Sequence, residues 1–243
     1  MRFNGISPSE LSPKIFVSHE VIDSVPAWDL NLVNGQRQSY LNGIQIRDRD
    51  IHLFLNFAGK NKENANELAR MVAGLFCVEE PGEYEPDQAK NLALTAILSG
   101  ASAMEWHWGF GVIEYTFKAP RPYYHSIAET ILTGTSVIRM EPRGSVACRP
   151  VITHTMAAAA AALEIKKDNV TFMRIRNPLG SNLTSGLKIE VDFVNRLVTV
   201  NNEAAMAFVD YTKSDWHPDI IKPATISLTD SGSTTVRWRD EWL

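Results

Sequence analysis

The alternation of apolar and polar residues between positions 43 and 57 constrains this chain more than any other feature of its sequence. Apolar side chains recur at every second position from Ile51 to Phe57. This period of two places them on one side of an extended strand. Arg47 and Arg49 are assigned to the intervening polar positions. The pattern predicts a long strand with one buried face.

A helical pattern follows a break at residues 59–61. Apolar residues in the segment 63–76 recur with the spacing of an amphipathic helix. Two further segments, 91–98 and 111–118, alternate with the period of strands. The first part of the chain is therefore predicted to be a set of strands with one helix packed against them.

Two prolines mark a junction near the middle of the chain. Pro120 and Pro122 lack backbone donors and favour extended conformations, so a regular sheet is not expected to continue through them. We place an N-terminal domain at residues 1–125 and a C-terminal domain at residues 126–243.

The C-terminal half has the rhythm of an antiparallel β-sandwich. From residue 136 onward, short alternating apolar runs are separated by turn residues at short intervals. One run of alanines, 157–162, has high helix propensity, but so short a segment is marginal as an isolated helix. Its conformation stays open at this point.

Charge and hydropathy exclude several classes of function. The chain carries 24 Lys and Arg against 28 Asp and Glu, without a basic run that would neutralise successive phosphates. Sequence-specific nucleic-acid binding is therefore not expected. No apolar run approaches the roughly 20 residues needed to span a bilayer, and the first residues lack a signal-peptide pattern. We expect a protein without a membrane span that is made in the cytoplasm.

The segment 105–108 places an acid, a base and two tryptophans together. Acid–base catalysis would require a second group across the substrate, and no second motif supplies one. We therefore interpret Trp106 and Trp108 as core or interface residues rather than parts of an active site.

Other candidate chemistry lacks a supporting motif. His52, His154 and His217 lie outside any known metal-ligand spacing, and no nucleotide-binding loop or serine-hydrolase elbow is present. Cys77 and Cys148 lie far apart and are expected to be buried free thiols. The sequence predicts no catalytic residue, cofactor or metal site, and thus not an enzyme.

Several segments, taken in their order along the chain, resemble the distal tail protein family, often called Dit, of siphoviruses. Each segment alone is a weak signal, because alternating strands and Pro-Tyr pairs are common in β proteins. Their joint order and spacing carry the resemblance, which extends over nearly the whole chain. The segments are residues 3–5, 43–57, 66–70, 119–124, 149–152, 187–201 and 236–239.

The resemblance implies a mostly β (α+β) chain with two domains. The N-terminal domain would be β-sandwich-like and ring-forming, with one helix, and the C-terminal domain a galectin-like antiparallel β-sandwich. The implied function is that of a structural virion protein at the tail tip of a long-tailed phage or prophage, assembled in the host bacterial cytoplasm. One departure is the alanine run 157–162, where glycines are common in the family.

The resemblance also implies partners. A homo-hexameric ring would join the tail-tube protein to the tail-associated hub protein and support receptor-binding proteins. A long strand with an unpaired edge is consistent with pairing between neighbouring copies. We expect Arg47, Arg49, Trp106 and Trp108 to lie at interfaces.

Two alternatives belong to other functional classes. A carbohydrate-binding module acting in host-surface recognition would use exposed aromatic residues, such as Trp106, Trp108 or Trp216, to stack on sugar rings. A wall-degrading hydrolase is the weaker alternative, because no acid–base pair or nucleophile can be named.

Overall fold

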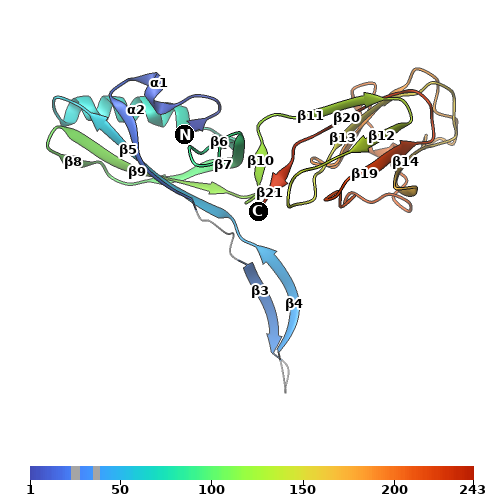
Figure 1. Ribbon diagram of the computed structural model, residues 1–243, viewed down its shortest axis with the longest axis horizontal. Coiled ribbons are helices and arrows are strands. Elements are labelled where there is room, and N and C mark those ends of the chain that lie inside the picture. The colour runs from blue at the N-terminus through green and yellow to red at the C-terminus, as the bar shows by residue number, and fades with distance from the viewer. Residues whose placement is uncertain (23–27, 35–38) are drawn as a thin grey trace. The chain divides into compact units, whose positions relative to one another are not determined.

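The computed structural model describes residues 1–22, 28–34 and 39–243, and it describes side chains outside residues 23–45. The chain divides into two compact units, Met1–His125 together with Leu243, and Ser126–Trp242 (Figure 1). The elements of the first unit are β1 (Arg2–Phe3), α1 (Pro8–Leu11), β2 (Ile15–Ile22), β3 (Trp28–Asn34), β4 (Ser39–Ile46), β5 (Arg49–Ala58), α2 (Lys62–Phe76), β6 (Gly82–Glu85), β7 (Leu92–Ala101), β8 (Glu105–His107) and β9 (Phe110–Ala119).

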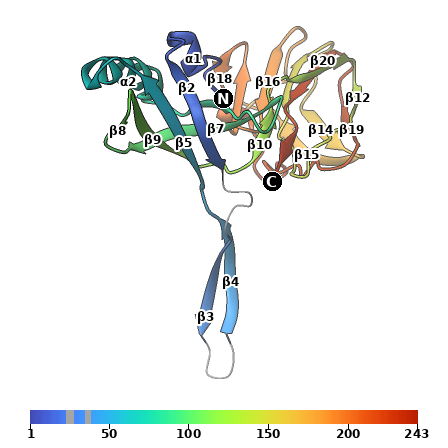
Figure 2. The same cartoon turned by 60° about the vertical axis from the view of Figure 1, so that its left-hand side comes forward.

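The main sheet of the first unit has the strand order β1-β6-β7-β9-β5-β2, and its strands pair antiparallel. The short strand β8 pairs with the beginning of β9. β3 and β4 pair with each other as a separate antiparallel hairpin that precedes β5 in the chain (Figure 2). The predicted strand 43–57 is thus divided between β4 and β5.

Alternation along β5 explains why this strand occupies the interior of the sheet. Its residues alternate regularly between buried and half-buried, and Leu53 and Leu55 are both 0% exposed. The prediction of one buried face is confirmed. The assignment of Arg49 to the opposite face was wrong, because an odd-numbered position shares the face of Ile51, and Arg49 is also 0% exposed.

Helix α2 packs against the buried face of this sheet. Its N-cap, Asn61, accepts a hydrogen bond from the backbone N–H of Asn64 at 2.9 Å, which satisfies a donor that a helix leaves free. At the other end, the ring of Phe76 lies 5.0 Å from that of Phe117 and 5.2 Å from that of Tyr115, in edge-on arrangements. The predicted helix 63–76 is confirmed, and the structure adds the short helix α1.

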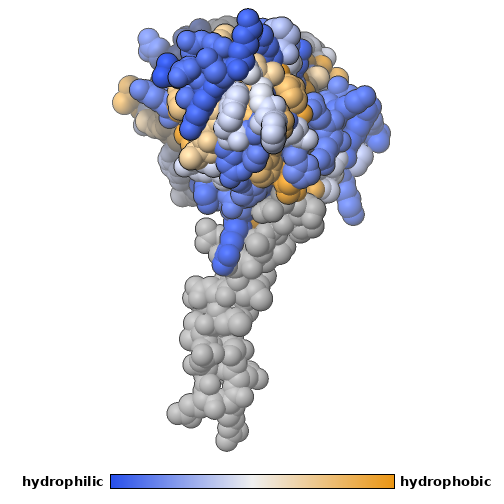
Figure 3. Space-filling model, turned by 90° about the vertical axis from the view of Figure 1, so that its left-hand side faces the viewer, coloured by the Kyte–Doolittle hydropathy of each residue, from blue (hydrophilic) through white to orange (hydrophobic). Residues whose placement is uncertain are grey.

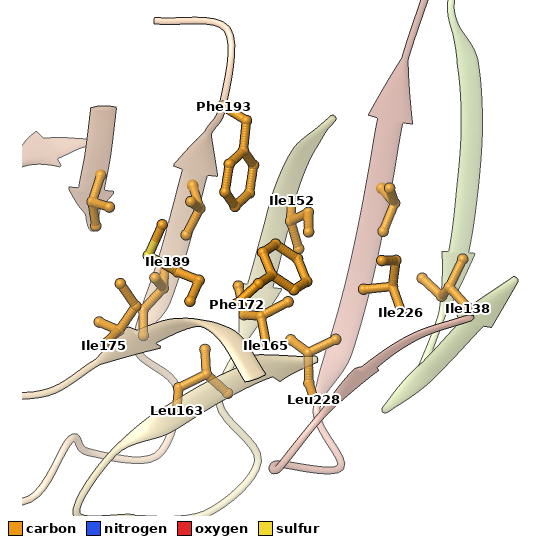
Figure 4. Packing of buried hydrophobic residues seen from close by; sticks show 14 of the residues in the cluster. Ile138, Ile152, Leu163, Ile165, Phe172, Ile175, Ile189, Phe193, Ile226 and Leu228 are labelled. Carbon is orange, nitrogen blue, oxygen red and sulfur yellow. The ribbon is translucent and has the colours of Figure 1, made fainter. Parts of the chain in front are cut away.

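The second unit contains two antiparallel sheets, with strand orders β11-β20-β13-β16-β17-β18 and β12-β19-β14-β15. Buried side chains of both sheets point toward one another, among them Ile152 and Ile189 of one sheet and Ile165 and Ile226 of the other (Figure 4). The mostly β, sandwich-forming prediction for this half is confirmed. Its elements are β11 (Thr130–Gly134), β12 (Val137–Met140), β13 (Val151–Thr155), β14 (Leu163–Lys167), β15 (Val170–Ile175), β16 (Lys188–Asp192), β17 (Leu197–Val200), β18 (Glu203–Ala204), the 3-10 turn η1 (Met206–Phe208), β19 (Ala224–Leu228), β20 (Ser233–Trp238) and β21 (Glu241–Trp242). The strand β10 (Tyr124–Ser126) spans the boundary between the two units in the sequence.

The alanine run 157–162 is a loop and not a helix. Ala160 forms an isolated bridge with Leu183, with hydrogen bonds in both directions of 3.1 and 2.8 Å. Tertiary hydrogen bonds therefore override the intrinsic helix propensity of a segment that is too short to nucleate on its own.

Leu53→Asp is expected to abolish the folding of the N-terminal domain, because it places a charge in a fully buried apolar site. Leu53→Ala should cost about 2 to 5 kcal/mol through lost burial and a cavity. Urea unfolding followed by circular dichroism measures both effects. The matched control is Asn56→Asp on the half-buried face of the same strand, and an equal loss in this control would contradict the strand register.

Candidate functional site

The β8–β9 hairpin presents the tryptophans singled out in the sequence. Trp108 stands at its turn and is fully exposed, whereas Trp106 is partly buried and packs against the apolar core of the N-terminal unit. Nε2 of His107 lies 3.6 Å from a carboxylate oxygen of Glu105, and both side chains are exposed. Neither side chain is enclosed, so the hairpin has the character of a contact surface and lacks the enclosure of an acid–base site.

The turn itself is strained. Trp108 has φ +25° and Gly109 has φ +95°, so a bulky residue occupies the left-handed region that glycine tolerates best. Such a conformation costs on the order of 1 kcal/mol or more. Backbone strain and an exposed aromatic ring are both typical of residues that contact another molecule. Trp108 combines the two.

The two arginine candidates lie in different environments. Arg47 is exposed and precedes β5. Arg49 is completely buried, and its guanidinium carbon lies 4.7 Å from the centre of the Tyr124 ring. The structure thus places Arg47 and Trp108 at the surface and Arg49 in the interior.

The histidines do not converge on a common site. His52 lies beside Glu114 with a nitrogen–oxygen distance of 2.7 Å, and His217 lies 3.4 Å from Arg196. His154 lies on β13 in the second unit and is buried. Among the residues whose side chains the structure describes, no three His, Cys, Asp or Glu residues are grouped so that they could hold a metal ion.

A buried polar network surrounds His154. Its Nε2 lies 2.9 Å from Oδ2 of Asp230, and its Nδ1 lies 2.9 Å from the hydroxyl oxygen of Thr234. Asp230 also accepts backbone N–H bonds from Ala157 at 2.7 Å and Gly232 at 2.9 Å. Both side chains are buried, and the network fixes the start of the alanine loop.

Hydrogen bonds determine the ionisation of Asp230. Burial alone would raise its pKa, but the N–H groups of Ala157 and Gly232, the His154 ring and the N–H of Ala158 together hold the pKa below its usual range.

The close approach of the chain requires glycine at position 232, because a Cβ there would lie 1.8 Å from the carbonyl oxygen of Thr155.

A second buried acid was not anticipated from the sequence. Glu20 accepts a 2.5 Å hydrogen bond from the hydroxyl of Tyr84 and one of 3.2 Å from the N–H of Asp87. Burial raises the pKa of Glu20, although the Tyr84 hydroxyl opposes the shift. The irregularity of β2 between Val17 and His19 turns this glutamate inward, and such a bulge has no clear signature in the sequence.

The two cysteines are free, but only one is buried. Burial raises the pKa of the Cys148 thiol to about 12, so it packs as a small apolar residue. The prediction of burial was wrong for Cys77, which is exposed because it caps the end of α2 outside the apolar stripe.

The second unit contains a surface hollow of about 430 Å³. Trp238 contributes to its wall but is only 4% exposed, and its indole N–H donates to Asp240 at 3.1 Å. Trp216 is partly buried, and the centre of its ring lies 5.7 Å from that of Phe193. The hollow is lined by Thr130, Leu132, Arg139, Glu141, Arg143, Trp238 and Asp240.

Within the described part of the chain, the helices are too short or too polar to cross a membrane.

Residues 143–242 match the family described as "Siphovirus-type tail component, C-terminal domain". The matched residues lie within the second unit of the chain. The resemblance to distal tail proteins is confirmed. The comparison with curated proteins gives no match.

The whole chain is similar in fold to the Dit protein of phage SPP1, which is described as a paradigm of the hub adsorption apparatus in phages that infect Gram-positive bacteria. The TM-score is 0.79 at 12% identity, and the similarity covers 99% of this chain and 98% of that one. A chain of the phage P2 baseplate in its activated conformation with Ca gives a TM-score of 0.52 at 9% identity, with coverages of 93% and 90%. The corresponding baseplate with Sr gives 0.52 at 10% identity, with the same coverages.

Asp230→Asn is expected to cost about 1.5 to 3 kcal/mol at neutral pH, because it weakens hydrogen bonds to a buried charge. The folded-state pKa of Asp230 is depressed, so its contribution is present above the unfolded pKa of 3.8 and is lost as the pH falls through the folded pKa. Thermal unfolding between pH 2 and pH 7 should show this acid-dependent loss in the wild type and a smaller one in the variant.

Asp219→Asn is the matched control, because it removes the same charge at an exposed position. If it changed the pH profile as much as Asp230→Asn, the network around His154 would not be the cause.

Proposed function

We propose that this chain is a distal tail protein that forms a hexameric ring between the tail tube and the tail-tip hub. The observation that carries the proposal is the similarity in fold to the SPP1 Dit protein across both units, together with the family match of the C-terminal domain. In this proposal, one face of the ring meets the tail-tube protein and the other meets the tail-associated hub protein. The C-terminal domain supports receptor-binding proteins, and the chain is a non-enzymatic virion protein assembled in the host cytoplasm.

An open sheet edge supports self-assembly. β2 is the terminal strand of the main sheet, and among the described strands only β5 pairs with it. Phe16 and Val21 on this strand are 45% and 40% exposed. Unpaired edges with exposed apolar residues favour association with another chain, and a closed ring of identical subunits satisfies every copy at once.

The surface of the molecule is compatible with contacts of this kind. Apolar residues come to the surface between hydrophilic ones on the face drawn in Figure 3. The fully exposed Trp108 and the exposed Arg47 are the two candidates placed to contact a neighbouring protein directly.

The proposal predicts a hexamer, or a monomer–hexamer equilibrium, when light scattering measures the mass of the full chain over a concentration series. A mass that remains that of a monomer at every concentration would contradict self-assembly of the isolated protein.

Trp108→Ala should weaken this assembly by at least about tenfold while leaving the melting temperature nearly unchanged, since the side chain is fully exposed and makes the contact of a typical interface hot spot. Tyr211→Ala is the control, because it removes a 61% exposed aromatic ring from the C-terminal unit. Equal assembly of the Trp108 variant and the wild type would remove Trp108 from the interface.

The exposure of Trp108 also favours one alternative, a carbohydrate-binding role in host-surface recognition. An exposed indole ring can stack on the apolar face of a sugar. Titration with host-wall saccharides distinguishes the two functions, because sugar binding would be lost in the Trp108 variant even if assembly were unchanged.

A further inference from the structure

Arg49 is the most unfavourably placed charged side chain in the described part of the N-terminal unit. It is 0% exposed, and its three guanidinium nitrogens have no hydrogen-bond acceptor among the described residues. An arginine side chain keeps its charge under all ordinary conditions and carries five N–H donors. A buried cation without acceptors is strongly destabilising.

The interaction that Arg49 does make is weaker than the one it lacks. Its guanidinium lies over the face of Tyr124 at 4.7 Å, within the range of a cation–π interaction. This contact uses the face of the guanidinium and leaves its N–H donors without oxygen partners. Planar guanidinium groups are best matched by carboxylates, which accept two parallel hydrogen bonds.

The acidic residues beside Arg49 in the sequence do not supply this partner. Asp50 belongs to the opposite face of β5, where its Oδ1 lies 3.5 Å from the ammonium group of Lys118. Asp48 is exposed and lies outside any strand. The side chain is therefore buried as a cation that the described part of its own chain does not neutralise.

The position of Arg49 in the fold indicates how another chain could reach it. It is the first residue of β5, and residues 47–48 form a break between β4 and β5. Tyr124, which covers the guanidinium, is only partly buried. Movement of the Tyr124 ring away from the guanidinium would open Arg49 to an incoming carboxylate, with Arg49 still held opposite Ala119 in the sheet.

We propose that Arg49 receives a carboxylate from a second copy of this chain when the ring closes, exchanging its contact with Tyr124 for that ion pair. The proposal rests on the ring-forming function proposed above and names the chemistry of one of its contacts. A second copy fits because acids exceed bases, 28 to 24, and each identical subunit supplies one acceptor for each Arg49. The unpaired charge then shifts the equilibrium toward the assembled ring, because it destabilises the single chain and is paired in the assembly.

The test compares the full-length wild type with Arg49→Met in two measurements, thermal unfolding of the dilute single chain and the mass distribution over a concentration series. Methionine fills similar apolar space without a charge. We expect the melting temperature of the dilute variant to rise by at least about 2 to 4 °C. Its assembly should be at least about 30-fold weaker than that of the wild type.

Two further variants make the result specific. Arg139→Met removes an exposed arginine from the C-terminal unit, and it should change neither measurement. Arg49→Lys keeps the cation but loses the planar fork, so it should assemble more weakly than the wild type and gain no stability.

The possible outcomes separate the inference from the function on which it rests. A more stable Arg49→Met variant that fails to assemble supports the inference. A less stable variant, or one that assembles as well as the wild type, overturns it while leaving the ring intact. A wild type that remains monomeric at every concentration overturns both the proposed self-assembly and the inference.

Discussion

The N-terminal unit depends on the pairing of β5 with β9. Every residue of β5 has a partner in β9, from Arg49 opposite Ala119 to Ala58 opposite Phe110. This register brings the buried residues of both strands onto one face, where α2 covers them through Phe76. A shift of this register by one residue would turn the apolar side chains of β5 to the opposite face. The packing of α2 therefore requires the observed register.

Asp230 in the second unit and Arg49 in the first are both buried, but the described residues give hydrogen bonds only to Asp230. We connect Asp230 with the stability of its own unit and Arg49 with the proposed assembly. Asp230 is surrounded by backbone donors and the His154 ring, so its charge stabilises a loop within its own domain. Arg49 is equally enclosed but has no acceptor in the described chain. The network around Asp230 is satisfied within the fold, whereas the charge of Arg49 would be satisfied by the carboxylate proposed above.

The sequence predicted the features that depend on local periodicity. The alternation in β5 and the apolar stripe of α2 are strong signals in the sequence, because packing and local conformation require the same pattern. The prediction for Arg49 was wrong because it followed the charge of the side chain. The odd-numbered position of Arg49 already places it on the face of Ile51. Glu20 could not be found, because the irregularity in β2 interrupts the alternation on which such a prediction relies.

Prediction was weakest where tertiary partners decide the conformation. The alanine run 157–162 is held by Asp230 and Leu183, which lie far away in the sequence. The exposure and positive φ of Trp108 have the same character, because both depend on the folded hairpin.

The strained Trp108 turn, the uncompensated Arg49 and the open edge of β2 all belong to the N-terminal unit. Each is unfavourable for a single chain, and in the proposed ring another copy would cover the Trp108 ring, pair with Arg49 or extend the sheet at β2. The C-terminal sandwich has its own buried core and satisfies its central polar network internally. Ring formation would therefore draw its driving force from the N-terminal unit, and the C-terminal sandwich could fold without it.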